Sequence, residues 1–182
     1  MLSRARVALF AGLAAVTWLA AWLPRTLAVA RTGVDGRGMP FGGDFIAFHA
    51  GARMALDGRA AQAFDHVAFF AAQDASLPGN EAHFLWNYPP TFHLLVTPLG
   101  LFPLVTACLV WWALTVPLYT AALVRVIPRP ETVLAAFASS AALLTLAHGQ
   151  NGFLVTGLLV GGLWAVLRSS PVAGGALLGL LV

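Results

Sequence analysis

Residues 7–23, VALFAGLAAVTWLAAWL, decide the fold class of this chain. The run contains no charged residue and lies between Arg4 and Arg6 on one side and Arg25 on the other. At about 1.5 Å of rise per residue, a helix of this length nearly crosses the roughly 30 Å hydrocarbon core of a bilayer. We therefore predict a first transmembrane helix over residues 7–28.

The composition of the whole chain agrees with a membrane protein. Of the 182 residues, 59% are hydrophobic and 9% are charged, and the mean hydropathy is +0.82. Water-soluble domains carry about a quarter charged residues, so that class is excluded. All ten basic residues are Arg and they are scattered, which argues against a nucleic-acid partner and removes lysine chemistry. The single cysteine, Cys108, allows neither a disulfide nor a cysteine zinc site.

The arginines also select a topology, because cytoplasmic loops are enriched in basic residues. If the N-terminus is cytoplasmic and residues 91–102 do not span, the span after residue 103 leaves Arg125, Arg129 and Arg168 on the cytoplasmic side. An extra span over residues 91–102 would place these three arginines on the opposite side of the membrane. We predict an all-α integral membrane protein with about five transmembrane helices, near 7–28, 104–126, 131–147, 151–167 and from 171 onward. The last apolar run, 171–182, is too short to cross, which predicts a truncated chain. Residues 1–182 would then form one membrane domain. A signal peptide cleaved near Ala30 is the alternative for the first helix.

The first extracytoplasmic loop, residues 31–103, is the polar part of the chain and holds six of the seven acidic residues. A glycine-rich segment, 33–43, is typical of a loop. Helical periodicity follows from Asp44 to Gly58, and a second short helix is predicted over residues 60–75. Both helices are too short to span, so we expect them to lie in the membrane interface.

Three polar residues of the first loop helix are candidates for chemistry. Asp44 is either a helix N-cap or a general base that takes a proton from an acceptor hydroxyl. His49 is either a packed core histidine or a ligand-binding group. Arg53 either pairs with Asp57 four residues later or holds a phosphate in bidentate geometry.

Two later motifs add further candidates. Tyr88 and His93 flank a Pro-Pro pair that fixes an extended backbone, and Trp86 is expected to be an aromatic anchor at the interface. His148, Gln150 and Asn151 interrupt an apolar stretch, either as a tight turn or as part of a substrate site. Under the predicted topology this turn faces the same side as the large loop. No histidine spacing supports a metal site, although Asp65, His66 and His83 are a weak option.

The chain resembles glycosyltransferase family 87 through four motifs in order along the sequence. They are Gly43-Asp44-Phe45, Phe64-Asp65, Tyr88-Pro89-Pro90 with Pro98 downstream, and Gly149-Gln150-Asn151. Members of this family are membrane mannosyltransferases of the C-type fold that use polyprenyl-phosphate sugar donors. Their chains continue through further spans and a Lys-Pro motif that this sequence lacks.

The resemblance implies transfer of a sugar, mannose in the family, from a polyprenyl-phosphate donor to a hydroxyl of a glycolipid or glycan. The reaction would invert the sugar, with Asp44 as the base. His49, Arg53, Tyr88, His93, His148, Gln150 and Asn151 are the candidate substrate-binding residues. No cofactor or metal is expected, and membrane lipids are the other partners. We expect a multi-pass protein of a bacterial plasma membrane whose active site faces the extracytoplasmic side. The alternative function is a non-catalytic lipid-binding or scaffolding module, or an inactive fragment of such an enzyme.

Overall fold

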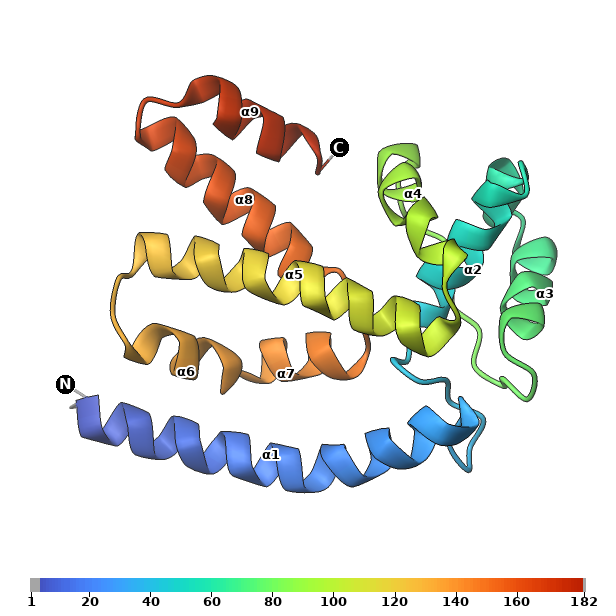
Figure 1. Cartoon of the computed structure of the whole chain (residues 1–182), viewed down its shortest axis with the longest axis horizontal. Helices are drawn as coiled ribbons and strands as arrows, with labels where there is room; N and C mark the ends of the chain where they lie inside the picture. Colours follow the sequence, from blue (N-terminus) through green and yellow to red (C-terminus); the bar gives the residue numbers. More distant parts are fainter. Residues whose placement is uncertain (1–3, 182) are drawn as a thin grey trace. The chain divides into compact units, whose positions relative to one another are not determined.

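A computed structural model describes residues 4–181, and the regular structure in this range is helical (Figure 1). Two helices in this range are long and apolar enough to cross a membrane: α1, Arg4–Thr32, and α5, Leu104–Val126. Along α1 large apolar side chains such as Leu9, Phe10 and Val16 are more than half exposed. Exposed apolar surface of this extent is unstable in water and stable in lipid. The predicted first and second spans are therefore confirmed as helices.

The chain forms two compact units, which we describe separately. The first contains residues 4–24 and 113–181, and the second contains residues 25–112.

The first unit contains the short apolar helices of the C-terminal half. They are α6, Glu131–Phe137; α7, Ser140–Ala147; α8, Gly152–Leu167; and α9, Pro171–Gly179. The predicted span over 131–147 is divided in two, because the Ser139 hydroxyl accepts a hydrogen bond from the Ala142 N–H and caps a new helix. Helices α8 and α9 lie side by side (Figure 1). The predicted count of five spans therefore stays a prediction.

The second unit is built around α2, Phe45–Leu56, of which nine of twelve residues are buried. The elements that pack on α2 include the 3-10 helix η1, Ala60–Phe64; α3, His66–Ser76; α4, Pro90–Val96; and the 3-10 helix η2, Thr97–Leu101 (Figure 1). Helix α2 ends as predicted, with Gly58 at a positive φ of 72°. The predicted helix over 60–75 is divided at Asp65, whose carboxylate accepts hydrogen bonds from the Val67 and Ala68 N–H groups.

Glycines allow close packing around α2. A Cβ on Gly51 would lie 2.6 Å from Cζ3 of Trp86, and a Cβ on Gly100 would lie 2.9 Å from the Ala52 carbonyl carbon. The Trp86 ring therefore rests directly on the α2 backbone and is only 4% exposed. The expectation that Trp86 is an interface anchor is wrong, because Gly51 provides the space that buries it. Helix α2 likewise packs its apolar side chains against protein, whereas an interfacial position for the loop helices stays a prediction.

Candidate functional site

Asp44 lies at the N-terminal end of α2 and is half-buried. Its backbone is already helical, with φ of −62° and ψ of −14°, and its side chain makes no capping hydrogen bond. The N-cap interpretation predicted such a bond, so capping does not account for a carboxylate at this position.

Tyr88 is the candidate residue that interacts with Asp44. Burial raises the pKa of the Tyr88 phenol, and the negative charge of Asp44 raises it further. The phenol therefore keeps its proton at neutral pH and can donate a hydrogen bond. Its ring packs edge-on against Phe48, with ring centroids 5.1 Å apart, and Phe48 follows Asp44 by one helical turn. Tyr88 thus lies against the same face of α2 as Asp44.

His49 and Arg53 lie on a different face of α2. At about 100° per residue, five residues rotate His49 by about 140° from Asp44, and nine residues rotate Arg53 by about 180°. Both side chains line a pocket of 360 Å³ on that face. Asp57 pairs with Arg59 at 3.1 Å, so the predicted Arg53–Asp57 pair is wrong. The structure therefore brings Asp44 and Tyr88 together and separates them from His49 and Arg53.

His93 is buried and its Nε2 lies 2.8 Å from the Gly51 carbonyl oxygen, to which it donates a hydrogen bond. Its ring packs on Trp86 with ring centroids 4.4 Å apart. These contacts fix α4 against α2. His93 also lines an apolar pocket of 430 Å³ together with Ala55, Phe64 and Leu94.

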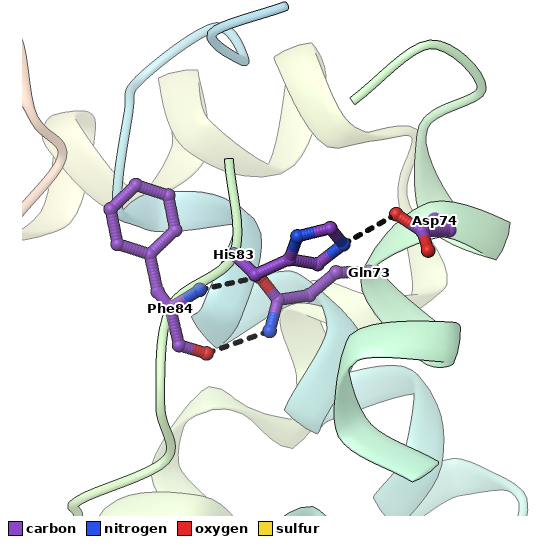
Figure 2. Close-up of polar contacts among 4 residues, drawn as sticks. All are labelled: Gln73, Asp74, His83 and Phe84. Atoms are coloured by element: carbon purple, nitrogen blue, oxygen red, sulfur yellow. Dashed lines mark hydrogen bonds and ion pairs between the residues drawn. The ribbon is translucent and has the colours of Figure 1, made fainter. Parts of the chain in front are cut away.

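The extended segment that carries Tyr88 is held by two residues that the sequence analysis did not single out (Figure 2). The buried side-chain amide of Gln73 accepts a hydrogen bond from the Phe84 N–H at 3.0 Å and donates one to the Phe84 carbonyl at 2.7 Å. Asp74 lies 2.8 Å from Nε2 of His83. Helix α3 therefore anchors residues 83–84, and through them it helps position Tyr88.

His148, Gln150 and Asn151 lie in the other compact unit, in the turn between α7 and α8. His148 is the C-cap of α7, and the Gln150 N–H donates to the Thr145 carbonyl at 3.1 Å. Asn151 is the N-cap of α8 without a side-chain capping bond. The backbone thus forms the predicted tight turn, and a substrate role for these side chains stays a prediction.

The other polar candidates have structural partners. Asp65 caps α3, and His83 pairs with Asp74. Within residues 4–181 no three His, Cys, Asp or Glu side chains are grouped so that they could hold a metal ion.

No curated protein and no solved structure matches the chain. The model of glycosyltransferase family 87 matches residues 86–182, which include Tyr88, His93 and the 148–151 turn but not Asp44. Because this match covers more than half of the sequence and the chain carries two helices able to span a bilayer, the protein belongs to glycosyltransferase family 87, a family of membrane glycosyltransferases.

Proposed function

We propose that this protein transfers a sugar, mannose in the first instance, from a polyprenyl-phosphate donor to a hydroxyl of a glycolipid or glycan, with Asp44 as general base. The observation that carries the proposal is that Asp44 lies close enough to Tyr88 for its negative charge to raise the pKa of the phenol. Tyr88 lies in the segment matched by the family, and Asp44 is a half-buried carboxylate at the start of α2. The site would face the extracytoplasmic side of a bacterial plasma membrane.

The reaction is a single displacement. Asp44 accepts the proton of the acceptor hydroxyl as its oxygen forms a bond to the anomeric carbon. The bond between that carbon and the phosphate oxygen breaks, and the electron pair leaves with the polyprenyl phosphate. Attack opposite to the leaving group inverts the anomeric centre. Tyr88 would donate a hydrogen bond beside Asp44 and orient the reacting hydroxyl or the phosphate.

Other residues support the proposal by position. The apolar pocket beside His93 is lined almost entirely by carbon and suits an isoprenoid chain. His93 would shape this pocket through its bond to Gly51, which leaves its ring fixed rather than mobile. His148, Gln150 and Asn151 are proposed to contact the sugar or the acceptor. His49 and Arg53 face away from Asp44, so we do not assign them to the leaving phosphate.

The proposal is tested by measuring sugar transfer in membranes that contain Asp44→Asn. Removal of a general base lowers the rate by about 10²–10⁴-fold, while the amount of protein in the membrane should not change. Tyr88→Phe keeps the ring contacts and should lower the rate by a smaller factor. Glu81→Gln is the matched control, because Glu81 is an exposed carboxylate of the same unit.

Wild-type transfer by Asp44→Asn would refute the catalytic role of Asp44. If the wild-type protein binds polyprenyl phosphate but transfers no sugar, the lipid-binding alternative is correct.

A further inference from the structure

The pocket on the Arg53 face of α2 has the chemistry of a second binding site. We call it the basic pocket. It is lined by His49, Arg53, Asp57, Arg59, Ser76 and Phe102, together with apolar neighbours, and has a volume of 360 Å³. Three separate segments meet in it: the second half of α2 with the turn that follows, the end of α3, and the residues that precede α5.

The charges of the basic pocket favour an anion. Asp57 and Arg59 form an ion pair at 3.1 Å and offset each other. Arg53 forms no ion pair within residues 4–181, so its positive charge is not offset by a carboxylate. A guanidinium presents N–H donors in a planar fork that matches two oxygens of a phosphate.

His49 adds a different requirement. Its side chain is 3% exposed, and its Nε2 lies 2.9 Å from the Phe102 carbonyl oxygen. A carbonyl oxygen only accepts, so Nε2 carries the hydrogen and Nδ1 of the neutral ring is an acceptor. Burial lowers the pKa of His49, the Phe102 carbonyl opposes this, and the charge of Arg53 lowers the pKa further, so the neutral ring predominates at pH 7.

Nδ1 of His49 is buried and has no hydrogen-bond partner. An unpaired buried polar atom is costly, and a structure that keeps one calls for an explanation. The atom has less than 1 Å² of accessible surface, so a hydroxyl group on a bound molecule would reach it, and remove the cost, once the lining side chains move slightly apart.

We infer that the basic pocket binds a phosphate ester that carries a neighbouring hydroxyl group, with Arg53 on the phosphate and His49 Nδ1 accepting from the hydroxyl. The site is separate from the Asp44 face, because the two lie on different sides of α2. The ligand is either a phospholipid headgroup of the polyol type or a soluble polyol phosphate, since both carry the same two groups.

Isothermal titration calorimetry on the full 182-residue chain in detergent, in a buffer without phosphate, tests the inference. The two soluble probes are glycerol 3-phosphate and ethyl phosphate, which share the phosphate but differ in hydroxyl groups. We expect glycerol 3-phosphate to bind about three- to tenfold more tightly, the effect of one hydrogen bond.

Variants separate the two contributions. Arg53→Gln should weaken both probes by about tenfold or more, and Arg53→Lys should retain part of the affinity because it keeps the charge. His49→Gln places an amide donor toward Phe102 but no acceptor at the Nδ1 position, so it should bind both probes equally. Arg31→Gln, an exposed arginine of the same unit, is the control and should behave as wild type.

Competition by lipid identifies the source of the ligand. If phosphatidylglycerol nanodiscs displace glycerol 3-phosphate and phosphatidylcholine nanodiscs do not, the ligand is a lipid headgroup. If neither kind of nanodisc displaces it, the ligand is a soluble ester. Wild-type affinity in Arg53→Gln, or an unchanged preference for glycerol 3-phosphate in His49→Gln, would overturn the inference. The first result would show that Arg53 only stabilises the C-terminal end of α2. The second would show that His49 only packs in the protein core.

Discussion

Replacement of Gln73 by Leu is the most direct test of how α3 positions the candidate site. Leu has a similar size, so the change removes two hydrogen bonds and leaves little empty space. The Phe84 N–H and carbonyl, now 3.0 and 2.7 Å from the Gln73 amide, would lose their partners (Figure 2). Because the side chain of Gln73 is fully buried, Leu is tolerated at the position itself and the cost falls on Phe84.

The magnitude follows from the two unpaired groups. Each buried polar group without a partner costs about 1–3 kcal/mol, so the full range for two is about 2–6 kcal/mol. Phe84 is half-buried and water reaches part of it, which places the expected loss near the lower end, at about 2 kcal/mol. Local opening at Phe84 would then be roughly thirtyfold more frequent.

Hydrogen exchange of the Phe84 amide measures this opening directly, and Trp86 fluorescence during chemical denaturation measures the unfolding of the surrounding unit. The control is Asp74→Asn, which disturbs the neighbouring exposed pair with His83 and should cost less than about 1 kcal/mol. We also expect Gln73→Leu to lower sugar transfer, because the segment that carries Tyr88 is released. An exchange rate within threefold of wild type would refute the view that Gln73 holds this segment.

Two further results are expected. Burial lowers the pKa of His49 in the folded protein below its ordinary 6.5, so the unfolded chain takes up the proton first and the free energy of unfolding should fall as the pH drops below about 6.5. Denaturation measured at several pH values should show a weaker fall in His49→Gln than in the wild type. An equal fall in both proteins would contradict His49 as the origin of the pH dependence. In the other unit, a Cβ on Gly174 would lie 2.7 Å from the Gly162 carbonyl oxygen and would overlap Cγ2 of Val166, so Gly174→Ala should destabilise α8 and α9 by about 1–3 kcal/mol. Gly175→Ala, with nothing within 4 Å of the added Cβ, is the matched control and should melt at the wild-type temperature or slightly above it.

The sequence by itself determined the membrane class and the positions of α1 and α5. Their long uncharged runs favour a bilayer, since a bilayer accepts only segments whose backbone groups are paired internally and whose side chains are apolar. It also determined where α2 ends, because Gly58 adopts the positive φ that the turn after the helix requires. The division of residues 131–147 was not predicted, although Ser139 at the break is a local capping signal that the apolar pattern outweighed.

Only the tertiary structure decided which candidates belong together. Asp44, His49 and Arg53 are close in sequence, yet the rotation of α2 places Asp44 with Tyr88 and sends the other two to the basic pocket. The burial of Trp86 depends on Gly51, thirty-five residues earlier, and the position of Phe84 depends on Gln73, eleven residues earlier. The periodicity of a sequence indicates which side of a helix is apolar. It does not indicate which distant residues a buried amide or ring contacts, because such contacts form only when the separate elements pack together.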